Sequence, residues 1–510
     1  MKKRFSFLLA LLCVLNMTSL SSCSENDTAQ TKEASVSADS ERTNGNVEET
    51  TEETEERILP DLPDVTYDGA AFRFYSWDHQ NWRVWDDIWV AELNGEPIND
   101  AVFNRNQMIE EKYNVTIQFT YDEYTTYEAN VRTAVAAGED SWEVILSMGH
   151  CIPRLYANNV FYNLHDLEYV NFEQPWWDQN CVESFTLAGY MPFTVSDMII
   201  LDKAVTSATF FNKQIAENHQ LGNLYSLVYE GTWTIAKMIE LGEIVSNDIN
   251  GDGIRNDEDV YGLVSGDDPV YMLFHSAGGR YITKDEQGYP QLSFESEHNF
   301  TAIKYYLEEL MYNENLTCNN QFKDDRMGAD KMFMQDHGLF MMSSLKTTDA
   351  LREMEADFGI MPIPKYQEEQ QNYASSVSVF GGNLISVPLT CQALDMTGVL
   401  LEAMSAESMY TLIPAFYDSV LKEKSARDQE SVDMLDIIIN NMVFDVGDFY
   451  NLADFPDYFL RITGSAAHLG RDQRTSDIAS FWASKKGNVT GKLKQLTKII
   501  DGWNAMTEAP

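Results

Sequence analysis

The chain has 510 residues, of which 44% are hydrophobic and 12% aromatic, and its formal net charge at pH 7 is −44. The length exceeds what a single hydrophobic core usually holds, so we expect two lobes of roughly 200 residues each. A strongly acidic protein repels phosphate backbones and anionic ligands, which argues against nucleic acid and leaves neutral or cationic small molecules as ligands.

The first residues predict export. Three cations at positions 2–4 precede an apolar run over 5–15 that is too short to span a membrane. The segment ends in Leu20-Ser21-Ser22-Cys23 and resembles a bacterial lipoprotein signal, 1–22, with its lipobox. The resemblance implies acylation of Cys23, palmitate included, and a mature protein held on the extracellular face of the cell membrane. The alternative is an ordinary secretory signal in which Cys23 is incidental.

Residues 23–64 predict a disordered, acidic tether that begins at the lipidated cysteine. The segment is rich in Ser, Thr, Glu and Asn, contains no aromatic residue, and carries a run of glutamates and threonines over 48–56. Such a composition buries too little apolar surface to offset the entropy of ordering, and like charges extend it.

Strands and helices alternate at the start of the body. We expect strands over 71–76, 115–119 and 142–146, with helices over 98–113 and 127–137 between them. This order is typical of an α/β protein with a largely parallel sheet. Because ligands bind beyond the carboxyl ends of such strands, Trp77, Asp78 and Ser147 become candidate ligand-binding residues.

Five further motifs follow in a characteristic order: GEDSWEVILSMG, MPFTVSDMIILDKAVTSATFFNKQI, EGTWTIAKMIELGEIV, DFGIMPIPKY and SSVSVFGGNLISVP. Together they resemble the extracellular solute-binding proteins of bacterial ABC importers, in the sugar-type, maltodextrin-binding-like branch. The resemblance implies a type II periplasmic-binding-protein-like fold, with each lobe a mostly parallel sheet flanked by helices and a ligand cleft between them. Lobe I then covers 65–193 and 384–415, and lobe II covers 194–383 and 416–510.

A cluster of tryptophans follows the first expected strand, at positions 77, 82, 85 and 89. Indole faces stack on sugar rings, so Trp77 and Trp82 are candidate ligand contacts, with Asp78, Asn81 and Asp86 beside them as hydroxyl partners. The alternative is core packing, which the spacing of Trp85 and Trp89 favours for those two as one helix face. Trp233 follows Thr232, an expected helix N-cap, and is more consistent with a structural role.

Other cleft residues come from the crossings between lobes. Asp197 in the first crossing can face the ligand or form a hinge salt bridge, and neither reading is preferred. Gly382 and Asn383 lie in the return crossing, where glycine permits rotation and close backbone approach. By family analogy, His275 and Ser344 bring lobe II loops to the cleft. For the aromatic residues Tyr450, Phe455 and Phe459, core packing is favoured over a cleft wall.

An acidic loop over 248–259 predicts a structural Ca²⁺ site. Oxygen-bearing side chains at loop positions 1, 3, 5 and 12, with Gly253 at position 6, match a twelve-residue calcium loop. The expected ligands are Asp248, Asn250, Asp252, the Ile254 carbonyl, Asn256 and Asp259. Aspartate at position 12, instead of the glutamate of an EF-hand, looks more like a dockerin-type loop. A metal-free acidic turn is the alternative.

Four cysteines remain in the body, at positions 151, 181, 318 and 391. Export permits disulfides, and Cys151 with Cys181 is the most plausible local pair, but four free buried thiols are equally consistent with the sequence.

No GxSxG, Walker A or strand-linked GxGxxG motif occurs, so we expect binding without catalysis. The expected function is membrane-anchored capture of a small solute, in particular an oligosaccharide, by hinge closure and its delivery to an ABC permease by a monomer. The alternatives are a cell-surface glycoside hydrolase or lyase and a glycan receptor that takes no part in transport.

Overall fold

The computed structural model describes residues 57–78, 85–265, 269–319, 327–421, 429–452, 454–463 and 474–507. The chain divides into two units, Met1–Arg57 and Ile58–Pro510, and the fold described below belongs to the second. Cys23, the signal, most of the tether and Trp82 lie outside the described residues, so their predicted roles stay predictions.

The first sheet has four strands in the order β12-β3-β1-β2. Its strands are β1 (Ala70–Trp77), β2 (Val115–Asp122), β3 (Val144–Met148) and β12 (Asn383–Ser386). The three strands expected near the start of the body are therefore present and run parallel, whereas β12 joins antiparallel to β3 from far along the chain. The strand β3 is buried along its whole length, as expected for a strand covered on both faces.

The second sheet has five strands in the order β10-β4-β9-β5-β8. They are β4 (Ser207–Asn212), β5 (Tyr261–Ser265), β8 (Thr317–Asn319), β9 (Gly338–Ser344) and β10 (Phe358–Met361). The strands β5, β8 and β9 are parallel, while β4 runs antiparallel to both of its neighbours. As a result, the carboxyl ends of β5, β8 and β9 and the start of β4 share one edge.

Two short ladders complete the strands. They are β6 (Ile282–Lys284) with β7 (Pro290–Leu292), an antiparallel hairpin, and β11 (Ser375–Ser376) with β13 (Met442–Val443), a parallel pair. The β11–β13 pair brings a C-terminal segment to the return crossing between the two sheets.

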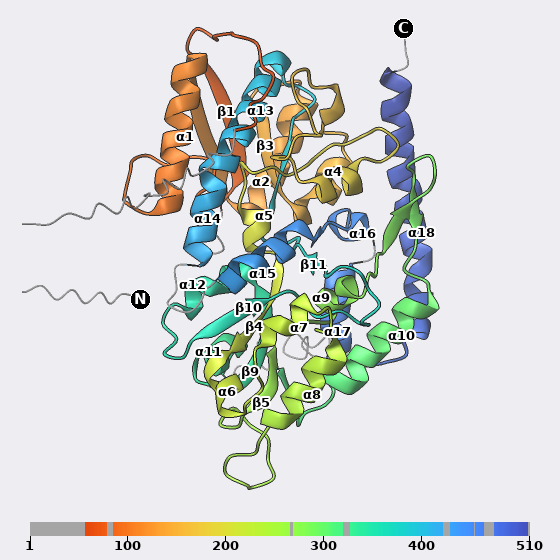
Figure 1. Cartoon of the computed structure of the whole chain (residues 1–510). Helices are drawn as coiled ribbons and strands as arrows, with labels where there is room; N and C mark the ends of the chain where they lie inside the picture. Colours follow the sequence, from red (N-terminus) through yellow and green to blue (C-terminus); the bar gives the residue numbers. More distant parts are fainter. Residues whose placement is uncertain are drawn as a thin grey trace, which may run out of the picture. The chain divides into compact units, whose positions relative to one another are not determined.

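Helices surround both sheets (Figure 1). Those up to the second sheet are α1 (Pro97–Tyr113), α2 (Tyr124–Ala136), α3 (Ile152–Tyr156), α4 (Gln179–Phe185), α5 (Leu201–Ala204), α6 (Lys213–Asn218), α7 (Leu224–Tyr229), α8 (Ile235–Val245) and α9 (Pro269–Ser276). The later ones are α10 (Glu297–Tyr305), α11 (Ala329–Met334), α12 (Thr348–Leu351), α13 (Leu394–Tyr410), α14 (Leu412–Val420), α15 (Gln429–Asn440), α16 (Val446–Phe449), α17 (Phe455–Thr463) and α18 (Ile478–Thr507).

The two-sheet α/β architecture confirms the predicted fold class. The chain passes from the first sheet to the second just before β4, and it returns just before β12. The proposed lobe boundaries themselves stay a prediction. Among the helices of the described chain, none combines the length and apolarity needed to cross a membrane.

The structure settles two expectations about the start of α8. The N-cap of α8 is Thr234, whose side chain accepts from the Lys237 N–H at 3.2 Å, so the expected cap at Thr232 is wrong. Trp233 is structural, as predicted, because it is fully buried and its Nε1 donates to the Pro362 carbonyl at 2.9 Å.

The four body cysteines are free and buried, so the reading with four thiols is confirmed and the Cys151–Cys181 pair is wrong. Burial raises the pKa of Cys151 to about 12, and a thiol with such a pKa stays protonated and unreactive at neutral pH.

Candidate functional site

Three predicted ligand residues meet at the carboxyl edge of the first sheet, where they are buried. Trp77 is 1% exposed, and its Nε1 donates to the side-chain oxygen of Asn383 at 2.9 Å. The Ser147 hydroxyl lies 2.9 Å from the Tyr127 hydroxyl. In this conformation these groups therefore join β1 to β12 and β3 to α2, and their contact with a ligand stays a prediction.

His275 from α9 is also buried. Its Nδ1 lies 3.2 Å from the Gly279 carbonyl, and its Nε2 lies 2.9 Å from Oδ2 of Asp448. Because a carbonyl only accepts, Nδ1 carries a proton. Burial lowers the pKa of His275 to about 4 and raises that of Asp448, which favours a neutral ring that accepts a hydrogen bond at Nε2 from a protonated carboxyl. The pair links α9 to α16 inside the core.

The other predicted ligand residues are more accessible or lie in the crossings. Ser344 ends β9 half-buried and is paired with Ser207 of β4, while Asp78 follows β1 half-buried. Gly382 is buried in the return crossing, where a Cβ would make only ordinary contacts. Tyr450 and Phe459 pack in the core, which confirms the favoured reading.

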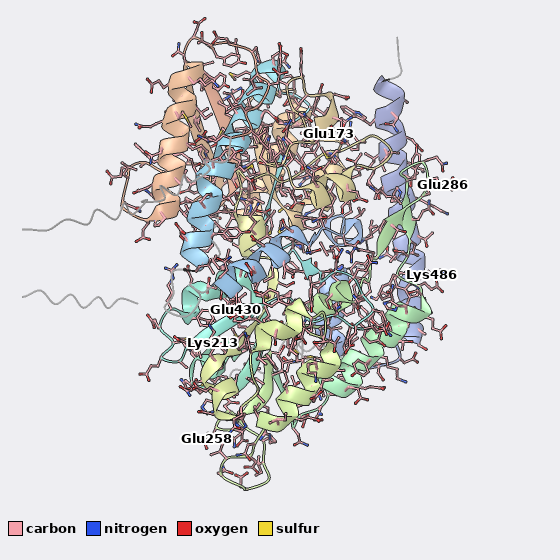
Figure 2. All side chains as sticks on the ribbon, in the orientation of Figure 1. Glu173, Lys213, Glu258, Glu286, Glu430 and Lys486 are labelled. Atoms are coloured by element: carbon pink, nitrogen blue, oxygen red, sulfur yellow. The ribbon has the colours of Figure 1, made fainter. Side chains whose placement is uncertain are left out.

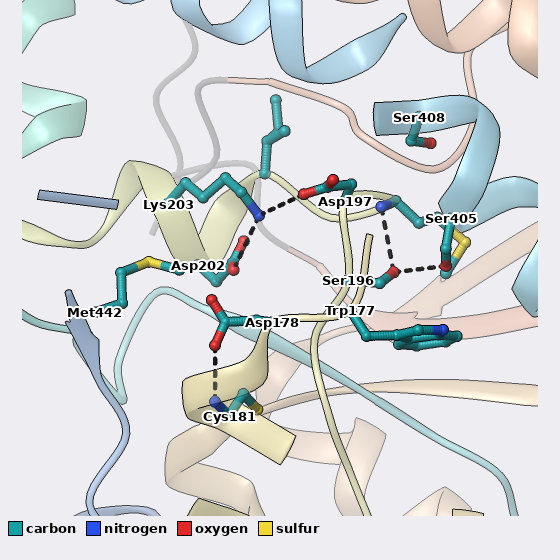
Figure 3. A network of polar contacts seen from close by, with 12 residues as sticks. Trp177, Asp178, Cys181, Ser196, Asp197, Asp202, Lys203, Ser405, Ser408 and Met442 are labelled. Atoms are coloured by element: carbon teal, nitrogen blue, oxygen red, sulfur yellow. Dashed lines mark hydrogen bonds and ion pairs between the residues drawn. The ribbon is translucent and has the colours of Figure 1, made fainter. Parts of the chain in front are cut away.

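Asp197 forms an ion pair in the first crossing. Its Oδ1 lies 3.4 Å from the Lys203 ammonium, which also lies 3.5 Å from Oδ2 of Asp202 (Figure 3). Burial raises the pKa of Asp197 and of Asp202 to about 6 each, even though Lys203 opposes the shift. The hinge salt bridge that the sequence allowed is therefore present, and a contact of Asp197 with ligand stays untested.

A buried arginine ties the crossing to the segment after β1. Arg105 on α1 is 0% exposed, and its guanidinium donates to the carbonyls of Asp87 and Ile88 at 2.9 Å each. The same group donates to the Met198 carbonyl at 3.4 Å and to the Ser408 hydroxyl at 3.1 Å. Asp87 in turn accepts the N–H of Ile200 at 3.1 Å. The segment that carries Trp85 and Asp86 is thus fixed to the first crossing.

A pocket of about 280 Å³ lies between this segment and helices α12 and α14, and we call it the loop pocket. It is lined by Trp85, Asp86, Val90, Asn94, Glu96, Ile98, Asn99, Asp349, Arg352 and Ser419. Trp85 is half-buried and meets the Phe416 ring edge to face, with ring centroids 5.7 Å apart. Arg352 pairs with Asp349 at 2.8 Å. An indole, carboxylates, amides and a guanidinium around one cavity can bind a hydroxyl-rich ring.

The expectation of a core helix face at Trp85 and Trp89 is wrong. Residues 85–96 contain no helix, Trp89 is 43% exposed, and α1 begins only at Pro97. The hydrogen bonds from Arg105 to backbone carbonyls hold the segment in an irregular path instead. No pattern in the sequence indicated three other lining residues, Asp349, Arg352 and Ser419. They lie in or beside helices more than 250 residues further along the chain than Trp85.

The acidic loop before β5 is held by hydrogen bonds from backbone N–H groups to two of its carboxylates. The Asp248 carboxylate accepts the N–H groups of Gly251 and Gly253 at 2.8 Å each, and Gly253 has a φ of +78°. Asp259 is fully buried and accepts from the backbone of Ile249 and Asn256. The donor set fits a hard, oxygen-preferring cation. Within the described ranges, however, no three His, Cys, Asp or Glu side chains converge closely enough to hold a metal.

The family model for bacterial extracellular solute-binding proteins matches residues 105–429 of this chain. The chain belongs to this family. The matched segment includes Arg105, both crossings, the acidic loop and α12 and α14 of the loop pocket. A search of curated proteins found no match.

Several solved structures share the fold of this family member at low sequence identity. UspC from M. tuberculosis is 12% identical with a TM-score of 0.54, over 82% of this chain and 100% of UspC. The sugar-binding protein MalE from Xanthomonas citri is 11% identical with a TM-score of 0.52, over 86% of this chain and 100% of MalE. A cyclo/maltodextrin-binding protein complexed with maltotetraose is 10% identical with a TM-score of 0.52, over 85% and 97%.

Proposed function

We propose that this extracellular solute-binding protein captures a saccharide between its two sheet-bearing halves and delivers it to an ABC permease without chemical turnover. The match of the family model to residues 105–429 carries the proposal. Two of the structural relatives are named for binding sugars, one of them in complex with maltotetraose. The ligand is proposed to be an oligosaccharide.

The loop pocket supports the proposed mode of capture. Its wall combines Trp85 and the segment after β1 with Asp349 and Arg352 next to the second sheet. A solute bound there contacts both halves and therefore favours the arrangement in which they lie close together. The network from Arg105 to Met198 connects the same wall to the first crossing, where a hinge rotation would occur.

We further propose that Cys23 carries the lipid that holds the protein on the extracellular face of the cell membrane. We also propose that residues 248–259 bind a structural Ca²⁺. The lipobox sequence supports the first proposal, and the donor set of the loop supports the second. The metal would tie the ends of the loop together and take no part in solute binding.

The first test is a thermal-shift screen of the exported protein carrying Cys23→Ser. Because this variant lacks the proposed lipid attachment site, it should also be absent from the membrane fraction. Neutral mono- and oligosaccharides, including maltotetraose, are the probes. A sugar at 100 times its dissociation constant should add about 2.7 kcal/mol to the free energy of unfolding. Chromatography of the same samples should recover the sugar unchanged. Released products would instead support a glycoside hydrolase.

Two variants of one segment test the site. Trp85→Ala should weaken sugar binding at least tenfold, because it removes the stacking surface of the loop pocket. Trp89→Ala is the matched control, since Trp89 lies four residues away, is exposed and does not line the pocket. Equal affinities for the two variants would place the sugar elsewhere.

A further inference from the structure

The return crossing joins the two sheets through residues 377–382. At its start, Val377 forms an antiparallel bridge with Thr206, immediately before β4 of the second sheet. At its end, Asn383 begins β12 and is paired with Met148, the last residue of β3. The crossing therefore runs from the edge where β4 begins to the carboxyl edge of the first sheet. Ligands bind at such edges in open α/β sheets.

Phe380 lies in the middle of this crossing and is exposed. Its side chain keeps 38% of its surface accessible, whereas every other phenylalanine whose exposure the structure describes is buried or half-buried. Its ring packs against the His150 ring, with centroids 5.3 Å apart and an angle of 33° between the ring planes. Part of the phenyl surface thus remains accessible to a ligand.

His150 fixes the position of Phe380. His150 follows β3, and its backbone N–H donates to the Val379 carbonyl at 2.9 Å, which ties the crossing to the end of the first sheet. The Phe380 N–H donates to Ser378 Oγ at 3.3 Å. Burial lowers the pKa of His150, which favours a neutral imidazole behind the phenyl ring at pH 7. An aromatic ring that is already held in place loses little freedom when a ligand stacks on it.

An accessible aromatic face at this place suits the apolar C–H face of a pyranose ring. A single exposed hydrophobic side chain is common on protein surfaces, but Phe380 has a ring packed behind it and lies between the edges of both sheets. We propose that Phe380, supported by His150, is a stacking surface for one pyranose ring of the captured saccharide. Phe380 does not line the loop pocket, so it adds a contact outside that pocket. This inference rests on the proposed function, because it names a further contact of the same solute.

Three variants test the surface by calorimetric titration with maltotetraose, or with the neutral oligosaccharide that gives the largest thermal shift if maltotetraose gives none. Phe380→Ala should weaken binding at least tenfold, because the stacking face is lost. Phe380→Tyr keeps an aromatic face and should bind within about threefold of the parent. The control is Tyr229→Ala, which removes an aromatic side chain that is 50% exposed on α7, and it should leave the affinity unchanged. Phe380 belongs to neither buried core cluster of the described chain, so its variants should fold, as thermal unfolding will verify.

Phe380→Trp provides a direct report of contact. This variant should still bind the oligosaccharide. The fluorescence that it shows in excess of the parent should become less accessible to acrylamide when the sugar is added, because a stacked ring covers the indole. A purely structural role of Phe380 would produce no such protection.

The outcomes separate this inference from the proposed function. Unchanged affinity in Phe380→Ala, equal losses in Phe380→Ala and Phe380→Tyr, or unchanged quenching in Phe380→Trp would overturn the stacking role and leave saccharide capture standing. A folded parent protein that binds no neutral mono- or oligosaccharide overturns both.

Discussion

At the scale of single residues, the first crossing depends on one buried lysine shared by two carboxylates. Lys203 lies within 3.5 Å of Asp197 and of Asp202, and Oδ1 of Asp202 is buried without a hydrogen bond among the described residues. Burial disfavours the charged carboxylates more than the ammonium favours them, so both pKa values rise to about 6. The crossing therefore carries charge that is costly at neutral pH.

This arrangement predicts a pH-dependent effect of Asp202→Asn. The folded-state pKa of Asp202 is about 6 and lies above its value of about 3.9 in the unfolded chain. The folded state then binds more protons between pH 4 and 6, so the stabilisation from this group is present at low pH and is lost as pH rises through 6. Asp202→Asn lacks this loss. Its free energy of unfolding relative to that of the parent should therefore rise by about 1–3 kcal/mol between pH 4.5 and pH 7.

Urea unfolding at pH 4.5, 5.5 and 7 measures the difference. Glu173→Gln removes an exposed acid, labelled in Figure 2, that forms no part of the Lys203 ion pairs; it serves as the control and should show no such trend. A difference between parent and Asp202→Asn that is constant with pH would show that Asp202 has an ordinary pKa in the folded protein.

At the scale of elements, the loop over 248–259 connects α8 to β5 with two of its glycines at positive φ. If it binds Ca²⁺, chelation should lower the melting temperature of the protein, and Asp252→Ala should abolish the Ca²⁺-dependent shift by removing one ligand. Thermal unfolding with 1 mM Ca²⁺ or with chelator measures this. Glu258→Ala is the control, because Glu258 lies in the same loop but outside the expected ligand set. Identical melting with Ca²⁺ and chelator in the parent would support the metal-free turn.

Local patterns predicted elements well where periodicity was clear. The strands β1, β2 and β3 and the helices α1 and α2 lie within a few residues of their expected positions. The prediction failed at Trp85 and Trp89, because spacing by four residues can arise without a helix. There, hydrogen bonds from a distant guanidinium decide the backbone path.

At the scale of the whole described fold, one flank joins the two halves. Helix α18 packs Trp482 against Phe294 on the side of the second sheet, with ring centroids 4.8 Å apart. Further along, Trp503 lies 5.2 Å from the Tyr190 ring, and the Asn504 side chain donates to the Ala188 carbonyl at 3.1 Å. The helix runs beside both halves in Figure 1. We therefore expect the two halves to separate mainly at the loop pocket, where the contacts between them are polar and more exposed.

The double variant W503A/N504A tests this role of α18. It should destabilise the protein by about 3–5 kcal/mol, because a buried indole is lost. In the absence of ligand it should also broaden the distribution of distances between the two halves. Spin labels on cysteines introduced at Glu173 and Glu258 report those distances, since the four native thiols in the described part of the chain are buried. The control Lys494→Ala changes an exposed position of α18 and should leave the distribution unchanged. An unchanged distribution in W503A/N504A would show that α18 does not restrain opening.

The sequence by itself determined the features that depend on local composition and order. These are the α/β class, the family resemblance, the candidate export signal and the acidic loop, because periodicity, turn residues and motif spacing are properties of adjacent residues. Only the tertiary structure decided which tryptophan lines a pocket and which polar groups are buried. Trp77 and Trp85 lie eight residues apart, yet Trp77 pairs with Asn383 in the core and Trp85 faces Asp349 and Arg352 across the loop pocket. Partners from far along the chain fix these environments, so no local pattern could reveal them.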